Sequence, residues 1–265
     1  MPLPHRFRLA TFNANSVRSR LPIILGWLAA HQPDVLCLQE TKAQDQDFPA
    51  AAFREAGYHV VFRGEKSYNG VAIASRQPPD EARYGFDDGG PADDTRLIMV
   101  QVAGLAIVNT YVPQGRALSH PQFQMKLEWL ARLAAYFDRH FTPEAAVIWA
   151  GDLNVAPEPM DVPSPEELAE HVCFAPAARQ ALATTRAWGF IDVVRQHHPE
   201  PGLFTFFDYR VPNAAKRGIG WRIDHILATA PLAARCQDAF VDLAPRLAAK
   251  PSDHTFLVAD FALSQ

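Results

Sequence analysis

Short apolar runs recur along the whole chain, and most of them have the length or the alternation of β-strands. The wholly apolar run Val35–Leu38 is typical of a central strand buried on both faces. The polar segment 63–70 joins 58–62 to 71–75, and Gly104 marks the turn between 96–102 and 105–112, as expected for paired strands. Strands are predicted at Arg6–Phe12, Val35–Leu38, Tyr58–Phe62, Val71–Ser75, Arg96–Val102, Leu105–Val112, Ala145–Ala150, Leu203–Tyr209, Arg222–Thr229, Ala239–Leu243 and Thr255–Phe261.

Apolar residues at helical spacing separate several of these strands. A proline is tolerated in the first turn of a helix, so Pro22 is expected near a helix start. Gly189 is expected to end the helix that precedes it. Helices are predicted at Pro22–His31, Pro121–Phe137 and Ala177–Trp188, and the capping box Ser164–Glu167 predicts the start of another.

Strands run from one end of the chain to the other, mixed with hairpins and helices. This order predicts an α/β fold in which two mixed sheets pack face to face with helices outside. The Pro- and Asp-rich stretch Gln77–Asp94 is interpreted as a long surface loop, and no linker divides the chain. We therefore expect one domain spanning residues 1–265.

Composition limits the function classes. A formal net charge of −4 argues against a protein held on nucleic acid by its overall charge, although a local basic groove is compatible with it. Cys37, Cys173 and Cys236 have neither disulfide nor zinc spacing, which favours reduced, buried thiols in a cytoplasmic protein. No segment resembles a signal peptide or a membrane span, so no membrane partner is expected.

Five polar segments follow or end apolar runs. Together they supply carboxylates, amides and a histidine at strand ends, which are the groups that hold a hard divalent cation and assist phosphate ester hydrolysis. The segments are Thr11–Asn15, Leu38–Lys42, Gly151–Asn154, Trp221–His225 and Pro251–His254.

Taken singly, several of these residues also have a plain structural interpretation. Glu40 follows a buried strand, where α/β sheets place ligands, but an isolated glutamate there also fits a surface loop. Asn13 and Asn15 fit turns equally well. For Asp152 and Asn154 the two interpretations are balanced: if the chain is extended both side chains point the same way, and Gly151 allows close backbone approach.

Asp224 interrupts an apolar run, and an aspartate in a strand core needs a fixed partner. A histidine whose ring it orients is the most useful one. Strand alternation favours His254 over the neighbouring His225. Tyr111 ends a strand, and its hydroxyl is interpreted either as the polar rim of a packed ring or as a hydrogen-bond donor to a phosphate.

Seven segments together resemble the exonuclease III family, the bacterial AP endonucleases of the endonuclease/exonuclease/phosphatase superfamily. They occur in the family's order and cover nearly the whole chain. They are Asn13–Arg18, Leu38–Lys42, Tyr111–Gly115, Gly151–Pro157, Phe207–Arg210, Gly220–Asp224 and Pro251–His254.

The resemblance implies a four-layer α/β sandwich and a Mg²⁺ or Mn²⁺ site. Glu40 would be the main ligand, and the wider ligand set would be Asn13, Asp152, Asn154, Asp253 and His254. Asp152 would also activate the attacking water, and Asn154 and Tyr111 would hold the phosphate. His254, oriented by Asp224, would stabilise the transition state.

The resemblance further implies a monomer that acts on double-stranded DNA with abasic sites or blocked 3′ ends. It would cut 5′ to abasic sites and have 3′–5′ exonuclease and 3′-phosphodiesterase or phosphatase activity. Phe206, Trp221 and Ile223 match the apolar pocket for a flipped-out abasic sugar, with Arg116 as a further substrate-binding residue. Basic residues that could form a DNA groove are Arg18, Arg20, Lys42, Arg63, Lys66, Arg116, Lys216, Arg217 and Arg222.

Two segments differ from exonuclease III itself: Arg116–Phe123 is shorter, and Phe206-Phe207 replaces Trp-Phe. The balance among the three activities is therefore left open. The competing hypotheses are a superfamily phosphoesterase acting on RNA or a phosphoinositide, and a catalytically silent nucleic-acid-binding regulator. The second predicts a lost ligand among Glu40, Asp152, Asn154, Asp224 and His254, and none is missing.

Overall fold

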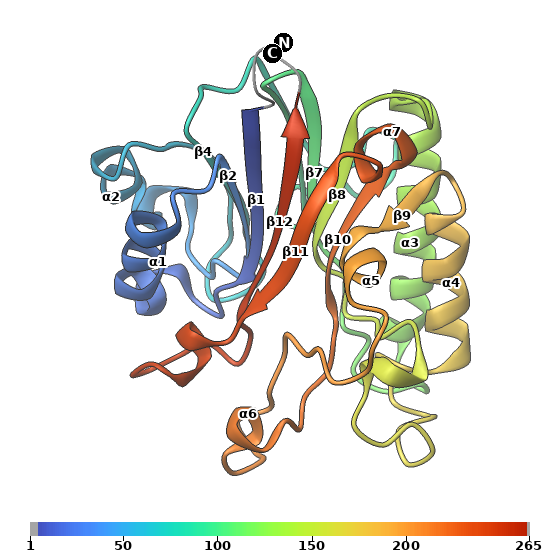
Figure 1. Cartoon of the computed structure of the whole chain (residues 1–265). Coiled ribbons are helices and arrows are strands. Elements are labelled where there is room, and N and C mark those ends of the chain that lie inside the picture. The colour runs from blue at the N-terminus through green and yellow to red at the C-terminus, as the bar shows by residue number, and fades with distance from the viewer. Residues whose placement is uncertain (1–4, 264–265) are drawn as a thin grey trace.

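Two six-stranded sheets pack face to face in the computed structural model, which describes residues 5–263 (Figure 1). In spatial order, the first sheet contains β11 (Cys236–Asp242), β12 (Phe256–Leu263), β1 (His5–Asn13), β2 (Val35–Gln39), β4 (Val71–Ser75) and β3 (His59–Arg63). The second contains β5 (Glu81–Tyr84), β6 (Leu97–Val102), β7 (Leu105–Tyr111), β8 (Val147–Asp152), β10 (Asp224–Thr229) and β9 (Phe190–Asp192).

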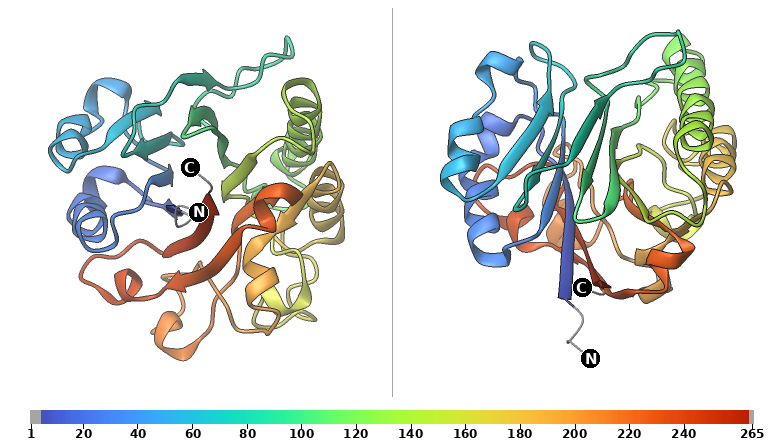
Figure 2. Two further views of the ribbon diagram at one scale, coloured as in Figure 1. Left: turned by 45° about the horizontal axis from the view of Figure 1, so that its top comes forward. Right: turned by 90° about the horizontal axis from the view of Figure 1, so that it is seen from above.

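Each sheet has one parallel strand pair at its centre, β1–β2 and β7–β8, and its other neighbours are antiparallel. A parallel pair needs a crossover connection, which α1 (Val17–His31) and α3 (Pro121–His140) provide. With α2 (Ala50–Glu55) and α4 (Pro176–Arg186), these helices cover the outer faces (Figure 2). The predicted four-layer α/β sandwich is confirmed. The carboxyl ends of both parallel pairs lie at the end of the sandwich opposite the start of β1 and the end of β12 (Figure 1).

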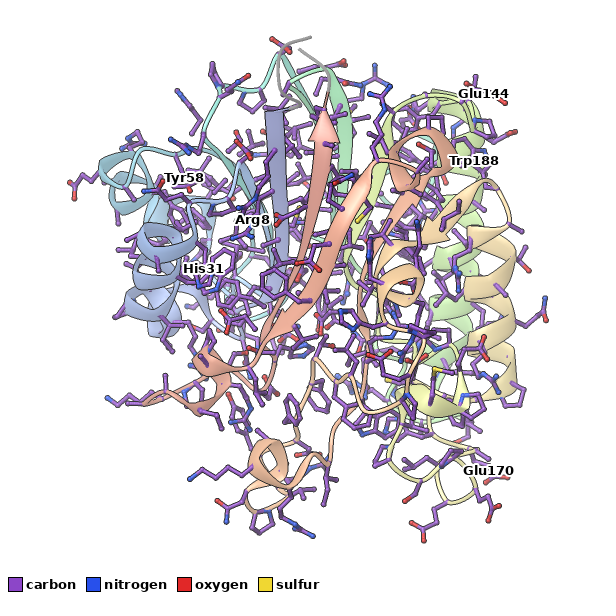
Figure 3. All side chains as sticks on the ribbon, in the orientation of Figure 1. Arg8, His31, Tyr58, Glu144, Glu170 and Trp188 are labelled. Carbon is purple, nitrogen blue, oxygen red and sulfur yellow. The ribbon has the colours of Figure 1, made fainter. Side chains whose placement is uncertain are left out.

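Alternation along the strands builds three apolar layers. In β2, Val35 and Cys37 belong to the cluster between the sheets, whereas Leu36 and Leu38 pack with Trp27 on the helix side. A corresponding cluster joins the second sheet to α3 and α4, and side chains fill the space between all layers (Figure 3). Because both faces of the central strands are covered, these strands are apolar runs, which explains why the sequence revealed them.

The first helix begins earlier than predicted. α1 starts at Val17 instead of Pro22, because Ser16 lies at its N-cap and accepts a hydrogen bond from the Ser19 backbone N–H at 3.5 Å. Pro22 therefore lies inside the helix and not in its first turn.

Three other expectations were wrong in detail. Ser164–Glu167 opens only a turn, with the Leu168 N–H donating to the Ser164 carbonyl, and no helix follows. Leu203–Tyr209 is not a strand, because only Phe206 forms isolated bridges, to Trp221 and His254. The loop predicted at Gln77–Asp94 contains the edge strand β5.

Several short elements were not predicted, because three to six residues carry too little periodicity to recognise. Besides α2, β5 and β9, they are α5 (Val193–His197), α6 (Ala214–Arg217), α7 (Ala230–Ala233) and the 3₁₀ turns η1 (Asp45–Asp47), η2 (Pro159–Asp161) and η3 (Ala244–Leu247). The loop that carries Glu170 projects at the same end of the molecule as α6 (Figures 1 and 3).

All three cysteines are free and buried, as expected. Within residues 5–263, no helix combines the length and the apolar character needed to cross a membrane.

Candidate active site

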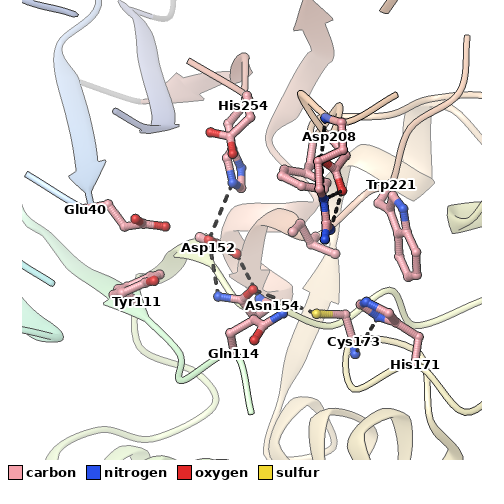
Figure 4. A pocket seen from close by; sticks show the side chains of 14 residues that line it. Glu40, Tyr111, Gln114, Asp152, Asn154, His171, Cys173, Asp208, Trp221 and His254 are labelled. Atoms are coloured by element: carbon pink, nitrogen blue, oxygen red, sulfur yellow. Dashed lines mark hydrogen bonds and ion pairs between the residues drawn. The ribbon is translucent and has the colours of Figure 1, made fainter. Parts of the chain in front are cut away.

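A cavity of about 180 Å³, open to solvent, lies where the carboxyl ends of the two parallel strand pairs meet (Figure 4). It contains most of the candidate residues identified from the sequence, although they come from distant parts of the chain. Its walls are formed by Glu40, Tyr111, Gln114, Asp152, Asn154, His171, Cys173, Phe206, Asp208, Arg210, Trp221, Ile223, Asp253 and His254.

Glu40 follows β2 directly and has a left-handed backbone (φ 46°), a strained conformation that is typical of functional sites. Its Oε1 accepts a hydrogen bond from Asn13 Nδ2 at 2.8 Å, and its Oε2 lies 2.8 Å from Lys42 Nζ. Burial alone would raise the pKa of Glu40, but the ammonium of Lys42 and these hydrogen bonds lower it. Glu40 is therefore a carboxylate at neutral pH.

Asn13 presents its amide nitrogen, and not its oxygen, to the carboxylates. Nδ2 donates to Glu40 and, at 2.8 Å, to Asp152 Oδ2, while Oδ1 accepts from the backbone N–H of Asn15. A donor that bridges two carboxylates holds them together but is not a cation ligand in this orientation. These hydrogen bonds do not favour Asn13 as a metal ligand, and its ligand role stays a prediction.

Asp152 is the last residue of β8 and is almost fully buried. In the sheet register it lies between Tyr111 of β7 and Asp224 of β10. Gly151 makes this placement possible: it has φ 140°, and a Cβ there would lie 2.0 Å from the Thr110 carbonyl oxygen. The close backbone approach expected for Gly151 is confirmed.

Asn154 reaches the same cavity by a turn and not by strand alternation. Its φ is 50°, and its backbone N–H donates to Asp152 Oδ1 at 2.9 Å. Both of its side-chain N–H groups have partners within the protein, the Val112 carbonyl at 3.0 Å and Asp152 Oδ2 at 3.3 Å. The extended conformation considered from the sequence is wrong, and Asn154 is placed to orient Asp152.

Asp224 and His254 form the expected pair. His254 Nδ1 lies 2.8 Å from Asp224 Oδ2. Its Nε2 points to Asp152 Oδ2 at 3.8 Å (Figure 4). His225 turns away, with Nε2 2.9 Å from the Val155 carbonyl. The choice of His254 over His225 as the partner of Asp224 is confirmed by this geometry.

The pair gives the site an asymmetric charge distribution. Burial alone would lower the pKa of His254, but the charge and hydrogen bond of Asp224 raise it to about 10. Burial, together with the nearby charges of Asp224 and Glu40, raises the pKa of Asp152 to about 7. Burial, together with the charges of Glu40 and Asp152, raises the pKa of Tyr111, so its phenol stays protonated. His254 is thus an imidazolium donor at neutral pH, which does not favour its predicted role as a ligand.

One group of potential metal ligands occurs among the described residues: ligand atoms of Glu40, Asp152 and His254 lie within 4.8 Å of one another. Asp152 is buried, Glu40 is half-buried, and both accept from Asn13 Nδ2. Two carboxylates this close repel each other, and a cation between them would relieve that repulsion. The two carboxylates therefore fit a hard divalent cation. Asp253 lies at the cavity wall outside this group, where its Oδ1 accepts from Asn15 Nδ2 at 3.0 Å.

The predicted substrate pocket is brought together only in part. Phe206, Trp221 and Ile223 line the cavity, and the Phe206 ring lies 4.9 Å from that of His254. Arg116 is exposed and lies in an adjoining hollow, which Tyr111 and Gln114 also line.

His171 and Cys173 line the same wall and were missed. The His171 ring lies 4.5 Å from that of Trp221, and the Cys173 thiol lies 3.8 Å from Asn154 Oδ1. Burial lowers the pKa of His171 and raises that of Cys173 to about 11. They belong to the loop 162–175, which has no periodic pattern, so no sequence signal identified them.

Arg222 does not belong to a basic groove. Its side chain is fully buried, with Nε 2.7 Å from Asp161 Oδ1 and Nη1 2.8 Å from Asp192 Oδ2. It joins η2 to the start of α5 beneath the cavity. We expect Arg222→Met to lower the free energy of unfolding by about 3–5 kcal/mol, because buried Asp192 loses its arginine partner and buried Asp161 keeps only Arg195. Urea unfolding measures this loss, and the exposed Arg54→Met should change stability by less than about 0.5 kcal/mol. Equal stability of the two variants would contradict the role of Arg222.

The same cluster predicts acid sensitivity. Burial alone would raise the pKa of Asp161 and Asp192, but Arg222 lowers both below the ordinary value. Their stabilising effect is present above the unfolded-state pKa of about 3.9 and is lost as pH falls toward the folded-state values. Wild-type stability should therefore begin to fall below about pH 5 and continue to fall below pH 3. In Arg222→Met, Asp192 loses its arginine partner and burial should raise its pKa, whereas Asp161 keeps Arg195, so the stability of the variant should fall less over the same pH range. Parallel curves would refute this account.

Comparisons with known proteins agree with this geometry. Residues 10–254 match the model of the endonuclease/exonuclease/phosphatase family. The chain is 32% identical to exodeoxyribonuclease III of Haemophilus influenzae, over 96% of this chain and 99% of that protein.

Solved structures are similar over nearly the whole chain. An AP endonuclease from Archaeoglobus fulgidus has a TM-score of 0.95 and 50% identity, covering 97% of this chain and 100% of that one. A 3′ phosphatase from Neisseria, bound to a product DNA hairpin, has a TM-score of 0.90 and 37% identity, covering 96% and 99%.

Proposed function

The chain belongs to the endonuclease/exonuclease/phosphatase family, and we propose that it hydrolyses the phosphodiester 5′ to abasic sites in duplex DNA with the help of a divalent cation. The proposal includes 3′–5′ exonuclease and 3′-phosphodiesterase or phosphatase activity at blocked 3′ ends. The relatives confirm the predicted class of enzyme, a hydrolase that acts as a DNA-repair nuclease.

One observation supports this proposal more than any other. An oriented histidine, His254, faces an almost fully buried carboxylate, Asp152, which in turn faces a second acid, Glu40, in an open cavity. A surface cluster of acids would need no such burial, and a silent regulator would have no reason to retain it.

The protein's own groups divide the work of an in-line attack by water. Asp152, held by Asn13 and Asn154, would orient the water and accept its proton. The imidazolium of His254 would donate to the charge that develops on the phosphoryl group, and Asp224 keeps its ring in position. A Mg²⁺ or Mn²⁺ ion held by Glu40 and Asp152 would supply further positive charge at the phosphate oxygens.

Tyr111 and Asn154 were predicted to hold the phosphate. Tyr111 is protonated and lines the cavity, which supports its role as a donor. Asn154 already donates both hydrogens within the protein, so it would reach the phosphate only after giving up one of those bonds. We therefore assign Asn154 mainly to the orientation of Asp152.

The wall opposite the acids would receive the sugar. Trp221, Ile223 and Phe206 present apolar surface, which suits a deoxyribose without a base better than a charged inositol phosphate. The structure of the Neisseria relative with product DNA supports a DNA substrate. A monomeric state and a cytoplasmic location are part of the proposal, and the three buried free cysteines fit a reducing compartment.

A substrate panel tests the proposal. The protein is incubated with Mg²⁺ and equal amounts of an abasic-analogue duplex, an undamaged duplex, a duplex with a 3′-phosphate, an RNA hairpin and a phosphoinositide. We expect turnover of the abasic and 3′-phosphate duplexes above that of the others. Preference for RNA or the phosphoinositide would replace this proposal with the corresponding phosphoesterase.

A further inference from the structure

Lys126 lies on α3, on the side that faces the second sheet, and its side chain is fully buried. It is the one buried lysine among residues 5–263. Burial lowers its pKa. Lysine is rarely buried without partners, so its contacts need an explanation.

The amine has three acceptors, one for each N–H of an ammonium group. Lys126 Nζ donates to the Asn154 carbonyl at 2.7 Å, the Val172 carbonyl at 2.8 Å and the Gln114 carbonyl at 3.2 Å. These carbonyls belong to three segments that are far apart in the sequence. No other buried cation joins them in the described part of the chain.

Each of the three segments also contributes a side chain to the cavity. Gln114 and Asn154 line it themselves, and Val172 lies between the lining residues His171 and Cys173. Lys126 does not line the cavity. One buried amine therefore fixes three cavity walls relative to one another, behind the groups that would touch substrate.

We propose that Lys126 is a positioning residue of the nuclease site, which sets the spacing of the segments at Gln114, Asn154 and Val172 around the substrate. The inference rests on the proposed function for its kinetic part but not for its geometric part. Without the ammonium, the three carbonyls lose their common donor, and the loop around Val172 moves away from Asn154.

A merely structural lysine would behave differently. Its loss would lower global stability and leave the folded site unchanged. A positioning lysine changes the site of the folded protein, because small displacements of positioned groups reduce turnover by about 10²-fold. The two roles are separated by comparing a Lys126 variant with an equally destabilised core variant.

The test uses Lys126→Met, with Leu133→Ala as the matched control. Leu133 is fully buried on the same helix and takes part in none of the three hydrogen bonds of Lys126. On the abasic duplex, we expect kcat of Lys126→Met to fall about 10²-fold with KM changed less than about threefold. Leu133→Ala should keep kcat within about twofold, although it loses stability.

A second readout needs no substrate. Cys173 follows Val172, whereas Cys37 and Cys236 lie in other parts of the fold and serve as internal references. The ammonium of Lys126 lowers the pKa of Cys173, so labelling rates with a thiol reagent are compared per thiolate, from their pH dependence. On that basis, labelling should be at least about tenfold faster at Cys173 in Lys126→Met, with Cys37 and Cys236 unchanged. Global unfolding would accelerate all three.

The results distinguish failure of the proposed function from failure of the proposed role of Lys126. An inactive wild-type protein would reject the proposed function, while the labelling result would still decide the geometric claim. Unchanged Cys173 labelling in Lys126→Met, or a normal kcat in an active enzyme, would overturn the role of Lys126.

If Lys126→Met does not fold, Lys126→Arg takes its place. The planar guanidinium cannot reach all three carbonyls in this arrangement, so slower turnover and faster Cys173 labelling are expected. Wild-type values for both would overturn the proposal.

Discussion

Asp152→Asn should reduce kcat on an abasic duplex by about 10³-fold or more while leaving the protein folded. The amide keeps the size of the carboxylate but cannot accept the proton of the attacking water. Stability should not fall with the activity, because removal of a costly buried charge offsets the hydrogen bonds that a single amide oxygen cannot accept from Asn13 and Asn154. The pKa of Asp152 is raised in the folded state, so its ionised form costs stability above the unfolded-state pKa of about 3.9, and most fully above pH 7.

The measurement pairs single-turnover kinetics in Mg²⁺ with thermal unfolding in EDTA at neutral pH. Asp138→Asn, at an exposed carboxylate on α3, is the control and should leave both values unchanged. Near-normal turnover of Asp152→Asn would rule out its role as the base. An Asp152→Asn variant that is inactive because it is unfolded would contradict the expected stability.

His254→Ala should lower kcat by about 10²–10⁴-fold, because it removes the positive donor that faces the phosphoryl group. It also leaves Asp224 buried without its partner, at a cost of about 3–5 kcal/mol. Adding Asp224→Asn to His254→Ala should restore much of that stability and none of the activity. The exposed His59→Ala should change neither property.

A double-mutant cycle checks this prediction. If Asp224 acts through His254, Asp224→Asn should lower kcat by itself but have little further effect once His254 is alanine. Fully additive effects of the two substitutions on kcat would contradict the view that Asp224 only orients the ring.

The layers of the fold were predictable because both faces of each central strand are covered. Covered strands become apolar runs such as Val35–Leu38, and their ends become abrupt changes to polar residues such as Glu40 and Asp152. The short strand β9 and the helices α5 to α7 depend on tertiary contacts, which no local pattern reveals. Pro22 misled the assignment of α1, because a proline inside a helix resembles one at its start.

The acid and histidine positions of the site were predictable for a related reason. Asp224 interrupts an apolar strand, and such an interruption needs a partner wherever the fold places it. Asn13 and Asn154 were identified, but not the direction of their amides, which depends on hydrogen bonds with residues elsewhere in the fold.

The burial of Lys126 and Arg222 could not be predicted from the sequence pattern. A charge in an amphipathic helix or beside a strand end usually indicates a solvated surface, and only the positions of distant carbonyls or carboxylates show otherwise. For Lys126 a signal existed: it lies three residues after Phe123 and four before Leu130, on the apolar stripe of α3. Arg222 had no such signal, because its partners lie 61 and 30 residues away.

The central claim is that the centre formed by Glu40, Asp152 and His254 cuts DNA at abasic sites with the help of a divalent cation. Its most direct test is incision of an end-labelled duplex with one abasic-site analogue, in Mg²⁺ and in EDTA. We predict a single cut immediately 5′ to the site, leaving a 3′-hydroxyl, in Mg²⁺ and none in EDTA. No incision in Mg²⁺, or undiminished incision in EDTA, would contradict the account.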